Sequence, residues 1–332
     1  VSKEMKLFYF LIVLTLFLGS LNIAQAKGYF IPDLSEDLVQ DNIINLNKMT
    51  LEQKIAQMII THGGIYNLET WKKMQLGGVH FFAMESEEVF KETINQFQDG
   101  MDIPFFVTAD LEGCLNPFSN FREFTAASEI ESIEQASKKG QEEGQFLASL
   151  GFNLNFAPVV DLDDKIWMCR SFPGEEENVA ELAKAYSTSL EEQGVSATAK
   201  HYPGKTLVVS DPHQNLVAAE ISEEDLYPYN LMVQENNIDL IMVSHIMVSG
   251  EIDSNSVPST VSPEVILPLK ENYNGLIISD DTIMLGLQNF YGGNTEQLYV
   301  DLVLAGNDVI LNFNEDPNEI YFMITSIKEA VE

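Results

Sequence analysis

Short apolar runs recur along this chain, and each is followed by a longer polar and amphipathic stretch. The runs cover residues 78–83, 104–109, 154–160, 195–199, 240–243, 276–278 and 308–311. Runs of this length are typical of buried parallel strands. With a first strand in or near residues 55–60, the pattern predicts about eight βα units in roughly 300 residues, the size of a (β/α)8 TIM-type barrel of the α/β class. A doubly wound open sheet is the structural alternative.

Residues that can carry out chemistry follow almost every apolar run directly. They are Asp110 and Glu112, Asp161, Lys200 and His201, His245, and Asp280 and Asp281. In a parallel barrel the carboxyl ends of all strands open on one face, where active sites lie. The positions of these residues therefore favour the barrel over the open sheet.

A single domain is the simpler organisation for the chain after residue 26. The full sequence has 45% hydrophobic residues, enough for a large core, and the part after residue 26 has no low-complexity tract or Pro/Gly/Ser linker. A helix start is visible at Thr50, whose side chain can cap the helix while Gln53 reaches back to it. We therefore expect one catalytic barrel over residues 27–332.

Residues 1–26 have the layout of a secretory signal peptide. Lys3 and Lys6 precede an apolar run from Leu7 to about Leu21, and small residues follow at 24–26. The run is shorter than the roughly 20 residues that a membrane-spanning helix needs. We therefore expect a cleaved signal, a periplasmic or extracellular protein, and no stable membrane span after cleavage.

The chain is strongly acidic, with 18 basic against 51 acidic residues and a formal net charge of -33. Nucleic-acid binding requires clustered Lys and Arg to neutralise phosphates. We therefore expect no nucleic-acid partner, and we interpret the acidity as a solvated surface. Nothing in the sequence indicates the oligomeric state.

The chain has two cysteines, Cys114 and Cys169. An oxidising compartment would permit one bridge between them, and two free buried thiols are an equal alternative.

Asp280 and Asp281 follow the apolar run 276–278. Because adjacent side chains on a strand point to opposite sides, we expect only one of the two to face a shared pocket. A carboxylate at a barrel mouth can attack the anomeric carbon of a sugar and form a covalent intermediate. A helix cap after the strand is the alternative for either residue.

The stretch from Lys200 to His213 is the most unusual in the chain. A strand end carries Lys200 and His201, and the following Gly/Pro loop carries Asp211 two residues before His213. An Asp that pairs with a His fixes the tautomer of the ring and raises its pKa, which suits general acid and base catalysis near neutral pH. An Asp-x-His in a loop is otherwise usually a turn.

Metal binding is not indicated by the pattern of possible ligands. The histidines at 62, 201, 213 and 245 are scattered and form no HxxxH or HxH pair, so we expect no metal and no other cofactor. Residues 161–164 lack the Gly and the closing Glu of a calcium loop, and we interpret Asp161 as part of a loop and helix cap.

From about Met49 to Asn312 the chain resembles glycoside hydrolase family 3, and within it the single-domain bacterial β-N-acetylhexosaminidases. The matching segments are MTLEQKIAQMI, GGVHFF, the Asp-x-Glu-Gly of 110–113, NFAPVVDL, the RSF of 170–172, KHYPG, EEDLYPYNLM and ISDD. Each segment alone is a weak signal, but their order and spacing together are specific.

The resemblance implies a retaining mechanism with three catalytic residues. His213 would be the acid/base, Asp211 its partner in a dyad, and Asp280 the nucleophile. The resemblance also implies that sugar hydroxyls are held by Asp110, Arg170, Lys200 and His201.

Three departures from the family pattern concern the site. Residues 114–117, Cys-Leu-Asn-Pro, stand where the pattern has Gly-Arg-Val-x-Arg, so both arginines are missing. Lys205 and Thr206 replace a His-Gly after KHYPG. Pro212 replaces the Ser between Asp211 and His213 and stiffens the backbone there.

The resemblance predicts an exported exo-glycosidase that removes terminal β-linked N-acetylglucosamine from cell-wall or chitin-type fragments. Its partner would be a carbohydrate that contains this sugar. The alternatives are a β-glucosidase-like or phosphorolytic enzyme of the same family, and a noncatalytic sugar-binding relative. Phosphorolysis is an alternative because a neutral imidazole base does not repel phosphate, and the missing arginines support the noncatalytic alternative.

Overall fold

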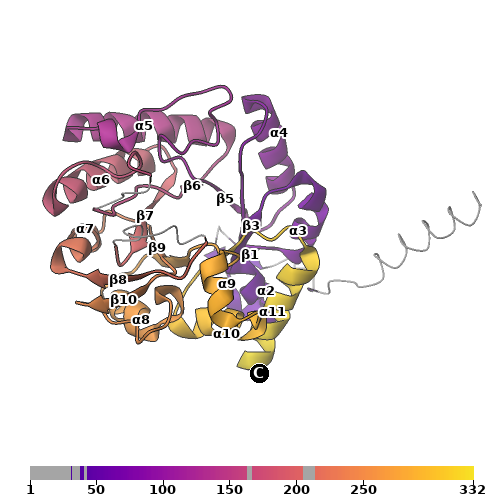
Figure 1. The fold of residues 1–332 in the computed structure, drawn as a ribbon. Helices are drawn as coiled ribbons and strands as arrows, with labels where there is room; N and C mark the ends of the chain where they lie inside the picture. Colours follow the sequence, from indigo (N-terminus) through magenta and orange to yellow (C-terminus); the bar gives the residue numbers. More distant parts are fainter. Residues whose placement is uncertain (1–30, 32–37, 41–42, 163–166, 205–213) are drawn as a thin grey trace, which may run out of the picture. The chain divides into compact units, whose positions relative to one another are not determined.

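The computed structural model describes residue 31 and residues 38–40, 43–162, 167–204 and 214–332. Apart from residue 31, these belong to one unit of the chain, Asp33–Glu332, whose fold is given below (Figure 1). Within the described ranges, no helix has the length and the apolar content that a membrane span requires.

An eight-stranded parallel sheet forms the centre of this unit, and helices surround it (Figure 1). The strand order around the sheet is β11-β9-β7-β6-β5-β4-β3-β12. Backbone hydrogen bonds join its two ends, from Asp308 N to Ile277 O (2.8 Å) and from Ser279 N to Val309 O (3.0 Å). The sheet is therefore nearly closed, and the predicted (β/α)8 barrel is confirmed.

The elements alternate along the chain as a barrel requires. The barrel strands are β3 (Ile59–His62), β4 (Gly78–His80), β5 (Phe106–Ala109), β6 (Leu154–Asn155), β7 (Ser196–Tyr202), β9 (Leu240–Val243), β11 (Leu276–Ser279) and β12 (Ile310–Asn312). The helices are α2 (Leu51–Gln57), α3 (Leu68–Met74), α4 (Glu87–Gln98), α5 (Ile133–Leu150), α6 (Glu176–Glu191), α7 (Glu223–Gln234), α8 (Pro263–Asn272), α9 (Leu285–Tyr291), α10 (Thr295–Ala305) and α11 (Pro317–Val331). Short 3-10 turns lie at Leu46–Lys48, Ile65–Asn67, Ala127–Glu129 and Ser259–Val261, and β1 (Val39–Gln40) pairs antiparallel with β2 (Ile43–Ile44).

Helix α2 precedes the first barrel strand. Thr50 Oγ1 accepts a hydrogen bond from Gln53 N at 3.3 Å, and Gln53 Oε1 accepts one from Thr50 N at 2.7 Å, which is the expected capping box. The helix runs to Gln57, so β3 begins only at Ile59, near the end of the predicted window. Lys328 Nζ on α11 donates to Glu52 Oε1 on α2 at 2.6 Å, which joins these two helices.

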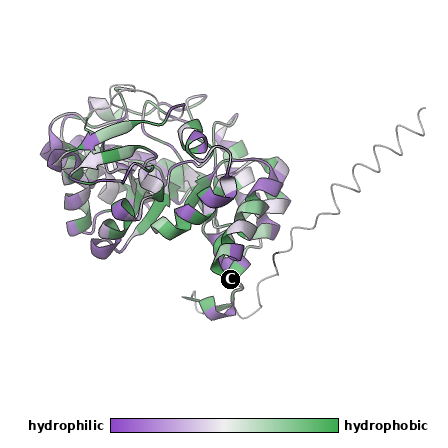
Figure 2. Ribbon diagram, turned by 60° about the horizontal axis from the view of Figure 1, so that its bottom comes forward, coloured by the Kyte–Doolittle hydropathy of each residue, from purple (hydrophilic) through white to green (hydrophobic). Residues whose placement is uncertain are grey.

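The barrel interior is filled by apolar side chains. They are Ile60, Leu154, Phe156, Leu240, Met242, Ile278, Val309 and Leu311. Figure 2 shows that hydrophobic residues are concentrated on the strands, whereas hydrophilic residues gather on the outer faces of the helices. Burial of these strands from both sides explains why they read as continuous apolar runs in the sequence.

Two strands form a second parallel sheet outside the barrel. They are β8 (Ala218–Ile221) and β10 (Met247–Gly250), and Ala218 pairs with Met247. Each follows a barrel strand along the chain, β8 after β7 and β10 after β9. The apolar runs did not predict this sheet, because only Ile221 of β8 is fully buried.

Candidate active site

A cavity of about 370 Å³ lies at the carboxyl ends of the barrel strands. It is lined by Phe82, Asp110, Glu112, Leu115, Phe156, Trp167, Arg170, Lys200, His201, Met242, Asp280, Asp281, Leu311 and Phe313. Its volume falls in the range of small-molecule sites, and its position is that of active sites in this type of barrel.

Every sequence-predicted site residue that the structure describes lines this cavity. Asp110 follows β5, Arg170 lies in the loop after β6, Lys200 and His201 lie in β7, and Asp280 follows β11. Residues far apart in the sequence therefore meet in one place because parallel strands end on one face. The other two predicted residues, at positions 211 and 213, lie outside the described residues.

Lys200 and its neighbours form a cluster of four charges, of which Asp110 is half-buried and the other three are buried. Lys200 Nζ lies 2.6 Å from Asp110 Oδ1 and 2.5 Å from Glu112 Oε1. Arg170 Nη1 lies 3.7 Å from Glu112 Oε1. The two cations balance the two carboxylates. Glu112, which joins them, was not among the predicted site residues, although its place after a strand end was a signal for it.

The charges of this cluster hold one another in the ionised state. Burial, the largest single effect, would raise the pKa of Asp110, but the Lys200 ammonium and smaller contributions from His80 and His201 together hold that pKa below its ordinary value. Burial would likewise lower the pKa of Lys200, but the carboxylates of Asp110 and Glu112 raise it. Asp110 and Lys200 are therefore both charged at neutral pH, which suits binding of sugar hydroxyls.

His80 contacts the other oxygen of Asp110, with 3.6 Å between His80 Nε2 and Asp110 Oδ2. Burial lowers the pKa of His80 to about 4, although Asp110 opposes the shift. The ring is therefore neutral at neutral pH, and this contact is not an ion pair there. His80 also stacks on Phe156 and Phe313, with ring centroids 5.4 and 4.6 Å apart. Sequence reasoning missed His80, although it lies within the GGVHFF segment.

Asp161 holds the His201 ring. Asp161 Oδ2 lies 2.8 Å from His201 Nδ1, and Asp161 Oδ1 accepts from His201 N at 3.1 Å. Burial would raise the pKa of Asp161, but His201 holds it below its ordinary value. Because a carboxylate only accepts hydrogen bonds, His201 Nδ1 carries the proton. Asp161 lies in a loop, as interpreted, but its buried carboxylate binds His201 of β7 and does not cap any of the described helices.

Asp280 and Asp281 both line the cavity. The expectation that only one of them would do so is wrong, because β11 ends at Ser279 and the alternation of a strand no longer applies. Asp281 Oδ1 accepts from the backbone N–H groups of Ile283 and Phe313, each at 3.2 Å. Asp281 thus fixes two loops, and Asp280 Oδ1 accepts from Asp281 N at 2.8 Å.

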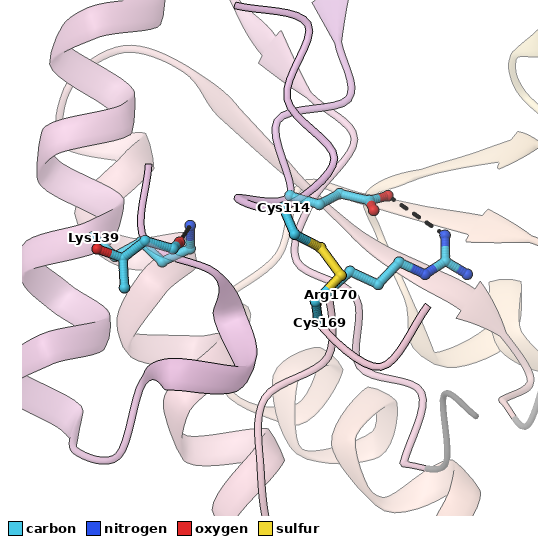
Figure 3. Close-up of a disulfide and its surroundings, with 6 residues drawn as sticks. Cys114, Lys139, Cys169 and Arg170 are labelled. Atoms are coloured by element: carbon cyan, nitrogen blue, oxygen red, sulfur yellow. Dashed lines mark hydrogen bonds and ion pairs between the residues drawn. A yellow bond between two sulfur atoms is a disulfide. The ribbon is translucent and has the colours of Figure 1, made fainter. Parts of the chain in front are cut away.

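Cys114 and Cys169 form a disulfide, with their Cα atoms 6.0 Å apart (Figure 3). Of the two alternatives that the sequence left open, the structure has the bridge. Cys114 lies two residues after Glu112, and Cys169 directly precedes Arg170. The bond therefore lies beside the charged cluster.

Metal ligands are not gathered in the part of the chain that the structure describes. No group of three or more His, Cys, Asp or Glu side chains there could hold a metal ion. His62 Nδ1 lies 2.9 Å from Glu315 Oε1, and His245 Nε2 lies 2.9 Å from Asp281 O. These two histidines are thus engaged in separate contacts.

Known proteins resemble this chain in sequence. The model of the glycosyl hydrolase family 3 N terminal domain matches residues 50–332. A beta-hexosaminidase of Haemophilus influenzae is 29% identical over 252 residues, which are 70% of this chain and 70% of that protein. A beta-N-acetylglucosaminidase/beta-glucosidase of Cellulomonas fimi is 25% identical over 281 residues, which are 78% of this chain and only 49% of that protein.

Solved structures share the fold. A glycoside hydrolase family 3 beta-N-acetylglucosaminidase from Paenibacillus sp. str. FPU-7 superposes with a TM-score of 0.73 at 24% identity, over 85% of this chain and 58% of that chain. M tuberculosis LpqI superposes with a TM-score of 0.77 at 21% identity, over 86% of this chain and 88% of that chain. The matched range, residues 50–332, includes the whole barrel and every residue that lines the cavity. The chain therefore belongs to glycoside hydrolase family 3.

Proposed function

We propose that this chain is a retaining exo-glycosidase that hydrolyses terminal β-linked N-acetylglucosamine from cell-wall or chitin-type fragments. The proposal depends on one observation: Asp280 and the charged cluster around Lys200 line the same cavity at the mouth of the barrel. A carboxylate faces a set of fixed donors and acceptors there, as sugar cleavage requires. The names of the family relatives support the choice of sugar.

The proposed reaction has two steps. A carboxylate oxygen of Asp280 forms a bond to the anomeric carbon while the bond to the leaving oxygen breaks, and protonated His213 gives its proton to that oxygen. His213, now neutral and oriented by Asp211, then takes a proton from water as the water oxygen bonds to the anomeric carbon and the bond from that carbon to Asp280 breaks. Two displacements at one carbon retain its configuration. The roles of His213 and Asp211 rest on the sequence alone.

The charged cluster would bind the sugar before the reaction. Lys200 and Arg170 can donate to hydroxyl oxygens, whereas Asp110 can accept from hydroxyl hydrogens. His201 can offer the Nε2 of its ring to a sugar hydroxyl, because Asp161 fixes the orientation of the ring through Nδ1. The aromatic rings of Phe82 and Phe313 stand edge to face with centroids 5.4 Å apart and give the cavity an apolar wall.

We also propose that residues 1–26 direct export of the protein and are then cleaved. The Cys114–Cys169 bond supports this, because disulfides persist in oxidising compartments. Expression with residues 1–26 in place should yield a periplasmic or culture-fluid protein whose first residue is Lys27. A protein that stays in the cytoplasm with residues 1–26 attached would contradict the proposal.

The proposed activity is tested by turnover on a panel of nitrophenyl sugars, with and without phosphate. We expect the N-acetyl-β-glucosaminide to be hydrolysed faster than the β-glucoside. The opposite order would favour a β-glucosidase-like enzyme. Formation of a sugar 1-phosphate would favour phosphorolysis, and sugar binding without any turnover would favour a noncatalytic relative.

The nucleophile is tested by substitution. Asp280→Ala and His213→Ala should each reduce turnover by about 10³-fold or more, the order of loss seen when a catalytic group is removed. Asp102→Ala is a matched control, because Asp102 is exposed and does not line the cavity. Normal turnover in Asp280→Ala would exclude Asp280 as the nucleophile.

A further inference from the structure

The disulfide joins the two loops that carry the Arg170–Glu112 ion pair. Cys114 lies in the loop after β5 and Cys169 in the loop after β6, 55 residues further along the chain. Figure 3 shows the bond beside Arg170, whose side chain runs from the bridge toward a carboxylate. That carboxylate is Glu112, 3.7 Å from the guanidinium. A covalent link and a charged contact therefore span the same pair of loops.

The loop after β5 turns sharply between Glu112 and the bridge. Gly113 has φ +95°, and a Cβ atom there would lie 2.5 Å from Thr125 O, so only glycine fits. The turn places the Glu112 side chain in the cavity, only 3% exposed, and leaves Cys114 exposed. Glu112 N also donates to Leu115 O at 3.0 Å. The disulfide thus lies outside the cavity while the residues beside it lie within.

The two loops are anchored unequally at the residues next to the bridge. Before Glu112, both backbone polar groups of Leu111 bind the side chain of Asn155, at 2.9 and 3.0 Å. On the other side, Cys169 O accepts from Ser128 N at 3.2 Å, and Ser171 forms a bridge with Val159. The loop after β5 is thus tied directly to β6 by the side chain of Asn155. The disulfide connects the Arg170 segment to this anchored loop.

We propose that the Cys114–Cys169 disulfide is a positioning bond that sets the spacing of Arg170 and Glu112 in the sugar site. Neither cysteine lines the cavity, so the bond acts through these two residues. It acts on sugar binding and not on the cleavage step, because Asp280 follows β11 and belongs to neither loop. This inference rests on the proposed sugar-binding function of the cavity.

The first test replaces the bond by the pair Cys114→Ser and Cys169→Ser. We expect the KM for the N-acetyl-β-glucosaminide to rise about tenfold, the effect of weakening one charged hydrogen bond to the sugar, with kcat within about twofold. Unchanged KM combined with a lower melting temperature would overturn the proposal, because the bond would then only stabilise the fold.

Reduction of the folded protein provides the same test without substitution. A dithiol passes two electrons and two protons to the bond, which becomes two thiols while the reagent becomes a disulfide. We expect the same rise of KM, reversed on reoxidation. The dithiol should have no effect on the double serine variant, which is the matched control. Reduction that leaves KM unchanged would again overturn the proposal.

Trp167 fluorescence separates this inference from the proposed function. Trp167 lies two residues before Cys169 and lines the cavity, whereas Trp71, the other tryptophan, is 0% exposed. Quenching by acrylamide should therefore report on Trp167 and increase when the bond is lost. If no sugar is turned over, the proposed function fails while increased quenching still supports positioning of the loop. Equal quenching in the oxidised and reduced protein would overturn the positioning role by itself.

Discussion

At the scale of single residues, the polar wall of the cavity consists of charges that are paired before any sugar binds. Lys200 lies between Asp110 and Glu112, and Arg170 completes the cluster. Buried charges are costly to desolvate, so each depends on its partners to stay ionised and in place. Groups fixed in this way need little rearrangement when the substrate arrives, which is the condition for electrostatic stabilisation of a transition state.

Asp161→Asn should reduce kcat/KM for the N-acetyl-β-glucosaminide by about 10- to 100-fold. Asp161 accepts from both the backbone N–H and the ring Nδ1 of His201, and an amide can accept only one of these bonds. The amide also lacks the negative charge that holds the Nδ1 proton, so the ring loses its fixed orientation and presents its Nε2 to the sugar less accurately. The expected loss is that of one hydrogen bond to a charged group.

The control for this prediction is Asp102→Asn, which makes the same change at an exposed position. Steady-state kinetics of both variants give the comparison, and circular dichroism checks that they are folded. A normal kcat/KM in Asp161→Asn would mean that the orientation of the His201 ring does not matter for catalysis.

At the scale of elements, a buried polar network connects the helices behind the cavity to the loop that carries Glu112. On α5, Lys139 Nζ is bonded to Glu143 and donates to Thr125 O at 2.8 Å. Tyr186 OH on α6 donates to Glu143 Oε2 at 2.7 Å and accepts from Asn155 Nδ2 on β6 at 3.0 Å. Since Asn155 also holds Leu111, the network supports the residue just before Glu112.

Tyr186→Phe should lower the free energy of unfolding by about 1–3 kcal/mol, because Glu143 Oε2 loses its donor and one N–H of the Asn155 amide loses its acceptor, both in a buried place. Burial already raises the pKa of Glu143, so the loss of a donor destabilises its carboxylate further. Urea denaturation measures the change. Tyr66→Phe is the control, since Tyr66 is 99% exposed and should lose almost nothing. Equal effects in the two variants would contradict a role for the network.

The sequence predicted the elements better than the contacts between them. The apolar runs located β5, β9 and β11, because a buried strand needs a local run of apolar residues. The capping box at Thr50 could also be predicted, because its two residues lie only three positions apart in the sequence. Pairing of Asp161 with His201, 40 residues away, depends on neighbouring strands and leaves no local signal. Family resemblance indicated the predicted residues that the structure describes in the cavity. It did not indicate Glu112 or His80, which contact Lys200 and Asp110.

At the scale of the whole molecule, the excess of acidic residues makes stability depend on pH. A net charge of -33 disfavours the compact state through self-repulsion, and the repulsion grows as carboxyl groups lose protons. One such group lies at the end of α6. Burial raises the pKa of Glu191 from 4.5 to about 7, and the Asp239 carboxylate adds to the shift. Among the described residues, Glu191 Oε1 is buried without a hydrogen-bond partner.

Glu191→Gln should therefore stabilise the protein only at high pH. Between pH 4.5 and about 7, Glu191 holds a proton in the folded protein and releases it in the unfolded chain. The stability that the protonated carboxyl contributes is therefore complete below pH 4.5 and is lost as the pH rises through 7. Glutamine keeps the shape without the charge. Allowing for partial exposure to solvent, we expect the free energy of unfolding of Glu191→Gln to exceed that of the parent by about 1 kcal/mol at pH 8 and to equal it near pH 4.5.

Urea denaturation at both pH values measures this difference. Glu192→Gln, which changes the exposed neighbouring residue, is the control. A difference that does not change with pH would show that Glu191 is ionised in the folded protein throughout this range.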